Sequence, residues 1–268
     1  MTSMSTSDKI KQIYSEYNNY LFEHFYDLAK FKKLNYAFAY SILLFDYGLD
    51  MVELNKQTRY ASILALGRDF LECYRHCKSL LEKYPTPDDY SKYVRFLYAN
   101  DMEQDRKIYN SITSSHPNTG DPTFYSDMGK QTTEIINGIT RTIETIFPER
   151  KDDIDPNNLW ESLRIIIEDL FSQYKHFDAD KARKVGEALK KNSAYMKINE
   201  GKPIEGCYTI YRLQCHATHS SISSVIERTI KDGIFTFNNK GNNIDETLLL
   251  VLHCLQDILD DTKQLISP

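Results

Sequence analysis

Regularly spaced apolar residues constrain the fold of this 268-residue chain more than any other feature of its sequence. In the segment 9–31, apolar side chains return every three or four positions, as one buried face of an α-helix requires. The segments 34–54 and 58–84 carry similar patterns, and the first of them is so evenly apolar that we expect a helix in the interior. The sequence therefore predicts long amphipathic helices.

The rest of the chain supports the same fold class. The ten Gly and eight Pro residues are too few for a fold rich in turns, which disfavours an all-β protein. We expect an all-α protein of about eight to ten helices, with one short β-hairpin at 233–243, where apolar residues stand beside turn-forming Asn and Gly. The other helices are expected at 88–111, 123–146, 158–177, 178–196, 207–231 and 247–266, and the segment 178–196 is polar enough to be an exposed connector.

The domain organisation follows from the absence of repeats and of long linkers. We expect a single helical domain over residues 1–268, with 1–115 and 120–268 as its halves if it divides, because a small, polar, turn-forming run separates them.

Charge and composition exclude several classes of function. The net charge of -5 opposes the coating of nucleic acid, and we expect no DNA partner. The first eleven residues contain no apolar run, and the nearly uncharged stretch 34–45 is shorter than the roughly 20 residues that span a bilayer, so we expect a cytoplasmic protein without membrane contact. Five cysteines within helical patterns indicate buried thiols. The sequence carries no dinucleotide or phosphate-loop motif and implies no cofactor.

The richest chemistry lies in the segment CYTIYRLQCHATHSSISSVI, residues 207–226. On a helix, Arg212 and His219 lie two turns apart on one face with His216 between them, while Tyr208 and Ser220 extend the same stripe. A guanidinium donates paired hydrogen bonds to a phosphate, and imidazole moves protons near neutral pH. These residues are therefore our candidates for binding and cleaving a phosphodiester.

Two other interpretations of this stripe stay open. The histidines could belong to a polar network inside the helical core of a non-catalytic protein. Alternatively, His216 and His219 could bind a metal ion with Glu72 or Asp169 as a third ligand, as in a metal-dependent hydrolase.

A second candidate pair, Arg68 and Glu72, stands four residues apart on the helix expected at 58–84, with Arg75 and His76 one turn further on. Both side chains point away from the apolar stripe, on a face where Ala61 and Ala65 leave room for another helix. Glu72 could orient one of the histidines, as carboxylates do behind catalytic imidazoles. The pair could equally be an ordinary ion pair on a solvated helix face.

The spacing of Arg212, six residues and His219 resembles the R-x4-6-H motif of the HEPN superfamily, all-helical proteins with toxin and defence members that cleave RNA without metal. The resemblance implies that Arg212 stabilises the transition state and that His219 acts as acid or base on the 2'-hydroxyl and leaving oxygen. It gives His216 no role, and Leu213 stands where the superfamily usually has a polar residue. Members commonly pair two motifs across a dimer, which implies a homodimer.

A second resemblance joins the segments ALGRDFLECY and YRLQCHATHSS. An R-x3-E helix followed by a Y-x7-H helix, here starting at Arg68 and Tyr211, is similar to a bacterial family of unknown function. This likeness brings no activity with it. The leading hypothesis is a HEPN-like, metal-independent RNA endonuclease of bacterial defence or toxin type; the alternatives are a non-catalytic helical interaction or sensor module and a metal-dependent hydrolase.

Three carboxylates near the C-terminus, Asp257, Asp260 and Asp261, share one side of the last helix. No histidine or cysteine joins them on that side, so we interpret them as a solvated helix end.

Overall fold

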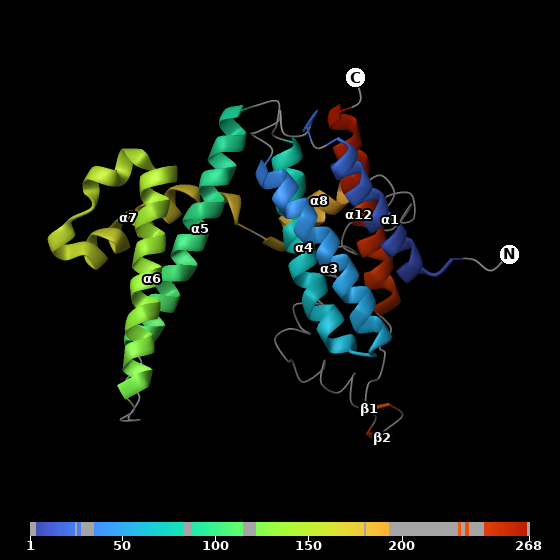
Figure 1. The fold of residues 1–268 in the computed structure, drawn as a ribbon, viewed down its shortest axis with the longest axis horizontal. Helices are drawn as coiled ribbons and strands as arrows, with labels where there is room; N and C mark the ends of the chain where they lie inside the picture. Colours follow the sequence, from blue (N-terminus) through green and yellow to red (C-terminus); the bar gives the residue numbers. More distant parts are fainter. Residues whose placement is uncertain are drawn as a thin grey trace. The chain divides into compact units, whose positions relative to one another are not determined.

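Long α-helices make up nearly all of the described chain, which confirms the prediction of an all-α protein of eight to ten helices (Figure 1). The computed structural model describes residues 4–24, 26–27, 35–82, 87–114, 122–179, 181–192, 230–231, 234–235 and 244–266. Its α-helices are α1 (Thr6–Glu23), α3 (Asn35–Lys56), α4 (Tyr60–Glu82), α5 (Pro87–Ser114), α6 (Pro122–Ile146), α7 (Leu159–Tyr174), α8 (Lys181–Lys190) and α12 (Ile244–Ile266). Short 3-10 helices are η2 (Pro148–Asp153), η3 (Pro156–Asn158) and η4 (Lys175–Phe177).

A pair of two-residue strands, β1 (Ile230–Lys231) and β2 (Ile234–Phe235), interrupts the helical pattern. They are antiparallel, with Ile230 opposite Phe235 and Lys231 opposite Ile234. The hairpin expected at 233–243 thus starts earlier in the sequence, and the helix expected to reach residue 231 does not include β1. The sequence Asp232-Gly233 between the strands is a stronger signal for a two-residue turn than the Asn-rich run that follows.

Contacts group the chain into two compact units. Unit 1 combines Met1–Pro85 with Asp180–Pro268, and unit 2 is the continuous segment Thr86–Ala179 between them. Unit 1 therefore forms from two stretches that are distant in sequence. The single domain and its halves at 1–115 and 120–268 stay predictions.

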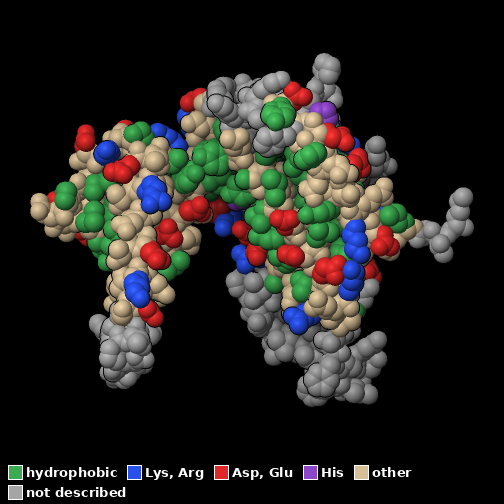
Figure 2. Space-filling view, viewed as in Figure 1, with side chains coloured by type: hydrophobic (Ala, Val, Ile, Leu, Met, Phe, Trp, Pro, Cys, Tyr) green, Lys and Arg blue, Asp and Glu red, His purple; other side chains and the backbone are tan. Residues whose placement is uncertain are grey.

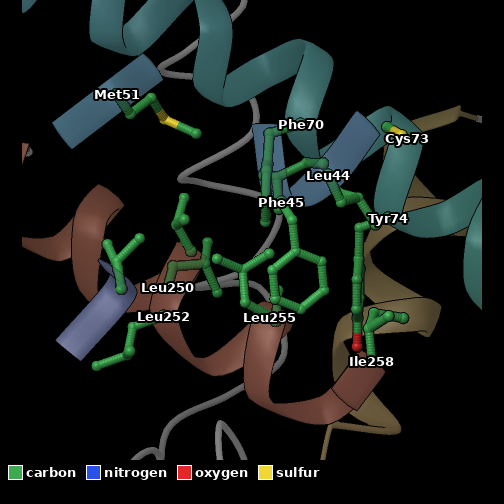
Figure 3. Packing of buried hydrophobic residues seen from close by; sticks show 14 of the residues in the cluster. Leu44, Phe45, Met51, Phe70, Cys73, Tyr74, Leu250, Leu252, Leu255 and Ile258 are labelled. Carbon is green, nitrogen blue, oxygen red and sulfur yellow. The ribbon is translucent and has the colours of Figure 1, made fainter. Parts of the chain in front are cut away.

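The core of unit 1 lies between α1, α3, α4 and α12. Figure 3 shows side chains of α3, α4 and α12 gathered around Phe45 and Leu255. The ring of Tyr17 stacks on Phe45 at 3.9 Å between centroids. Gly48 lets α3 and α12 approach closely, because a Cβ there would lie 2.8 Å from Leu255 Cδ1. These contacts explain why the apolar stripes of helices far apart in sequence are all buried.

Helix α3 is only partly an interior helix. Its buried face includes Leu44, Phe45 and Met51, but Ile42 and Leu43 on the other side are exposed. The prediction of an interior helix is wrong for that face, because an evenly apolar sequence does not tell one side of a helix from the other.

Helix α8 corrects the prediction of an exposed connector at 178–196. Its residues Val185, Ala188 and Leu189 are buried in the core of unit 1, where α8 packs against α4. The remaining positions are polar, so the average polarity of the segment hides a narrow apolar face.

A buried ion cluster joins α4 to α12 in unit 1. Lys78 Nζ lies 3.0 Å from Asp257 Oδ2 and 2.5 Å from Asp261 Oδ2, and the Tyr74 hydroxyl donates to Asp257 Oδ2 at 2.7 Å. Only 7% of the Lys78 side chain and 10% of that of Asp257 are exposed. The interpretation of these carboxylates as a solvated helix end is therefore wrong for Asp257 and Asp261, since their partner comes from a helix about 180 residues earlier.

The charges in this cluster do not cancel. Burial raises the pKa of Asp261, and the charges of Asp257 and Glu82 add to this effect, while the hydrogen bond and charge of Lys78 offset only part of it. Burial alone lowers the pKa of Lys78, but its hydrogen bonds and charge pairing with Asp261 and Asp257 outweigh that effect and raise the pKa. Lys78 therefore stays charged and holds the two carboxylates in place.

Unit 2 packs α5 against α6 and α7. The rings of Tyr109 on α5 and Trp160 on α7 stack at 3.5 Å. Arg95 donates two hydrogen bonds to Glu149, at 2.8 and 3.1 Å, and its guanidinium also lies over the ring of Phe147. Arg150 bonds to both Asp153 and Asp169. Ion pairs of Arg95 and Arg150 with carboxylates thus join the helices around a small aromatic core.

Charged side chains of both signs alternate over the face seen in Figure 2. Within the part of the chain that the structure describes, no helix has both the length and the apolar character to cross a membrane.

The junction of α3 and α4 holds one residue in a left-handed conformation. Thr58 has φ of 55°, and the hydrogen bonds from Thr58 N to Asn55 O and from Arg59 N to Leu54 O complete a Schellman motif. A threonine is strained at this position, where glycine is the usual residue. The backbone is therefore locally strained at the C-terminal end of α3.

We expect Thr58→Gly to raise the free energy of unfolding by about 1 kcal/mol, because glycine removes the Cβ strain of the left-handed residue. Urea unfolding at pH 7 measures the change. Thr58→Ala is the control: it keeps a Cβ, so a gain equal to that of the glycine variant would contradict the strain.

We expect Lys78→Ala to lower the free energy of unfolding by about 3–5 kcal/mol, since two carboxylates would then face each other without a buried counter-ion. The matched control is Lys263→Ala, which removes the half-exposed pair of Lys263 with Glu16 and should cost about 1 kcal/mol or less. Equal losses of the free energy of unfolding in the two variants would contradict a larger contribution of the buried cluster to stability.

Candidate functional site on helix α4

A row of charged and polar side chains follows one side of α4. Arg68, Glu72, Arg75 and His76 stand at spacings of four, three and one residue, so they share a continuous strip of the helix. Arg68 Nε donates to Glu72 Oε1 at 3.2 Å. Both side chains are only partly exposed, at 24% and 20%. The pair lies at the border of the core rather than on a fully solvated face.

The first residue of α8 adds a further cation to this row. Lys181 Nζ lies 3.8 Å from Glu72 Oε2, while the apolar face of α8 fixes the helix on α4. The prediction that Ala61 and Ala65 leave room for another helix stays a prediction, because the ion pairs of α8 with α4 lie further along the helix, at Glu72 and Glu82. Glu72 is thus approached by two cations, one from each helix.

Arg75 and His76 form the second half of the row. Arg75 is buried, and its Nη2 lies 3.0 Å from His76 Nε2. Because a guanidinium only donates, Nε2 must accept the bond and the proton of the neutral ring belongs on Nδ1. The ring also lies 5.4 Å from that of Tyr40 on α3. His76 is therefore oriented by contacts from two helices.

Burial, together with the charges of Arg75 and Lys181, lowers the pKa of His76 to about 3. The imidazole is neutral at physiological pH and too weak a base to take a proton there. His76 can accept a hydrogen bond and position Arg75. It is not suited to general acid or base catalysis.

The row has more cations than carboxylates. Arg68 and Lys181 both approach Glu72, and the neighbouring Asp69 has its pKa raised, first by burial and then by the charge of Glu72. A guanidinium and an ammonium group held close together in this way can attract an anionic group.

The structure brings together Arg68 and Glu72 among the residues that the sequence singled out. Arg212, His216, His219, Tyr208, Tyr211 and Ser220 lie outside the described residues. Sequence reasoning noted Arg75 and His76 one turn beyond the pair without giving them a role, and it missed Lys181. No local pattern points to a contact between α4 and α8.

A metal site was one of the alternatives. Among the residues that the structure describes, no group of three or more His, Cys, Asp or Glu side chains could hold a metal ion. The described cysteines Cys73, Cys77 and Cys254 are buried, in agreement with the prediction of buried thiols. Burial raises the pKa of the Cys73 thiol, which makes it unreactive.

Comparisons with known proteins add no family to this description. No family model matches the chain, and no curated protein and no solved structure matches it significantly. The function must therefore be argued from the residues themselves.

We expect His76 to make unit 1 sensitive to acid. The unfolded chain takes up a proton at His76 near pH 6.5, whereas the folded protein does so only near pH 3, so stability is lost as pH falls between these values. Between pH 7 and 4.5 the wild type should lose about 2–3 kcal/mol more free energy of unfolding than His76→Gln, which still accepts from Arg75 but does not titrate.

Urea unfolding of both proteins at several pH values measures this difference. His176→Gln is the control, because His176 is exposed in unit 2. Parallel pH profiles for wild type and His76→Gln would contradict the buried, neutral state of His76.

Proposed function

We propose that this protein is a metal-independent RNA endonuclease in which Arg212 and His219 carry the chemistry. The observation that carries the proposal is the meeting of two cations at Glu72, Arg68 of α4 at 3.2 Å and Lys181 of α8 at 3.8 Å. A phosphodiester is anionic and gains further negative charge on its oxygens in the transition state, so preorganised cations stabilise it. Arg68 and Lys181 provide such a setting at Glu72.

The reaction needs no metal if the nucleophile comes from the RNA. His219 takes the proton of the 2'-hydroxyl, and that oxygen attacks the adjacent phosphorus. The bond to the 5'-oxygen breaks, and this leaving oxygen receives from His219 the proton that the imidazole took from the 2'-hydroxyl. The products are a 2',3'-cyclic phosphate and a 5'-hydroxyl. Arg212 donates to the phosphate oxygens throughout.

Glu72 and His76 would support this chemistry without contact with the reacting atoms. Glu72 holds Arg68 by a hydrogen bond, and His76 accepts one from Arg75. The role of Glu72 in orienting a histidine of the segment 207–226 stays a prediction. A homodimer with the Arg212 helices near its two-fold axis belongs to the same proposal.

A second candidate function is a non-catalytic helical interaction module. The hydrogen bonds between members of the row favour it, because Arg68 pairs with Glu72 and Arg75 with His76 within one helix. In that protein the same groups would form a structural network.

Incubation of the purified protein with mixed RNA in EDTA separates these candidates. We expect cleavage that Arg212→Ala and His219→Ala each reduce at least about 100-fold, because each removes one part of the acid–base and electrostatic machinery. The control His176→Ala alters an exposed histidine of unit 2 and should cleave like the wild type.

Light scattering gives the oligomeric state of each variant, and circular dichroism verifies the fold. Absence of cleavage over varied RNAs, or full activity in His219→Ala, would overturn the nuclease and favour the interaction module.

A further inference from the structure

Two carboxylates of α12 share one ammonium group of α4 inside unit 1. Lys78 Nζ lies 3.0 Å from Asp257 Oδ2 and 2.5 Å from Asp261 Oδ2. Because both oxygens contact the same nitrogen, the carboxylates are close neighbours and repel each other when both are ionised. The side chains of Lys78 and Asp257 are buried, so water screens this repulsion poorly. The ammonium group balances one of the two negative charges.

Among the described residues that face the cluster from α4 and α8, none supplies a second cation. Tyr74 donates a hydrogen bond to Asp257 and stays neutral, because burial raises the pKa of its hydroxyl. Burial likewise raises the pKa of the Cys77 thiol. Glu82 adds a carboxylate, and its own counter-ion is Lys191, which follows α8 and lies 2.6 Å away. On these two sides the second negative charge of the cluster is therefore not balanced.

The described residues of α1 and α3, which also pack against α12, add no cation to the cluster. Lys263 of α12 pairs with Glu16 of α1 at 2.5 Å. Tyr17 of α1 shares a hydrogen bond with Ser41 of α3, and burial raises the pKa of its hydroxyl. The charge that Lys78 leaves unbalanced can thus be removed by a proton.

Asp261 is the member of the pair that water can reach. Its side chain is 27% exposed, whereas that of Asp257 is 10% exposed and also accepts the hydrogen bond of Tyr74. Burial and the charges of Asp257 and Glu82 raise the pKa of Asp261, and the contacts with Lys78 offset only part of this effect. The folded protein therefore holds a proton at Asp261 more tightly than the unfolded chain does.

We propose that Lys78, Asp257 and Asp261 form a proton-binding site that strengthens the docking of α12 on α4 when the medium becomes acidic. The proton comes from water and neutralises Asp261, which leaves Lys78 and Asp257 as a balanced ion pair. The site does not depend on RNA or on the proposed function.

The sign of the effect follows from linkage. Since the pKa of Asp261 is higher in the folded protein, the contribution of this site to stability rises as pH falls through that pKa. The gain is complete below about 3.9, the ordinary pKa of aspartate. His76, two residues before Lys78, acts in the opposite direction, because it destabilises the folded protein as pH falls. Helix α4 thus carries two groups whose responses to acid oppose each other.

NMR of the 13C-labelled full chain measures the proton directly. We expect the side-chain carboxyl carbon of Asp261 to titrate with a midpoint above about 3.9. Asp257→Asn removes the neighbouring negative charge, so the midpoint of Asp261 should shift downward in that variant. A midpoint at or below about 3.9 in the wild type, or one that Asp257→Asn leaves unchanged, would overturn the proton-binding site.

Urea unfolding of the wild type and Asp261→Asn measures the effect on stability. The amide has the neutral charge of the protonated acid and does not titrate. We expect the urea midpoint of the variant, relative to the wild type, to fall steadily as pH is lowered from about 7 to 4, because only the wild type takes up the proton. His76 titrates in both proteins and cancels in this difference.

The matched control is Asp260→Asn, which changes the adjacent, exposed aspartate that accepts a hydrogen bond from Gln256. Its urea midpoint should differ from that of the wild type by an amount that does not change with pH. The same constant difference for Asp261→Asn, or one that changes in the other direction, would overturn the role of the proton in docking α12.

Discussion

Lys78 of α4 carries its charge into the interior of unit 1, and the packing of the unit depends on the two carboxylates that pair with it. The ammonium lies between Asp257 and Asp261 of α12, and the hydroxyl of Tyr74 completes the cluster. Directional contacts of this kind allow little sliding of α12 along α4, whereas apolar packing alone would tolerate several registers. The register in turn fixes which side of α4 remains for its second set of polar residues.

That second side is the candidate site. One helix supplies the apolar stripe, the buried Lys78 and the row from Arg68 to His76, so its position relative to α3, α8 and α12 is set by contacts on several sides. Groups held in this way need little reorganisation when an anion arrives. The same rigidity would suit a structural network, which is why activity measurements and not geometry separate the two candidate functions.

The sequence predicted the helices better than the contacts between them, for a physical reason. Helices such as α6 and α12 are determined by local spacing, which the sequence displays directly. The pair Arg68–Glu72 is also local, since four residues make one helical turn. The contacts of Lys78 with α12 and of Lys181 with Glu72 join distant segments, and residue types alone do not encode them. The burial of α8 was missed because only three apolar residues carry it.

The division of unit 1 into two stretches has a consequence for how the chain folds during synthesis. All of unit 2 is synthesised before α8 and α12, so α1, α3 and α4 lack these partners while residues 86–179 can already fold. Tyr74 meets Asp257 only after 183 further residues have been added. The time needed to translate the segment 86–179 therefore sets how long the apolar surface of residues 1–85 that α8 and α12 cover stays exposed.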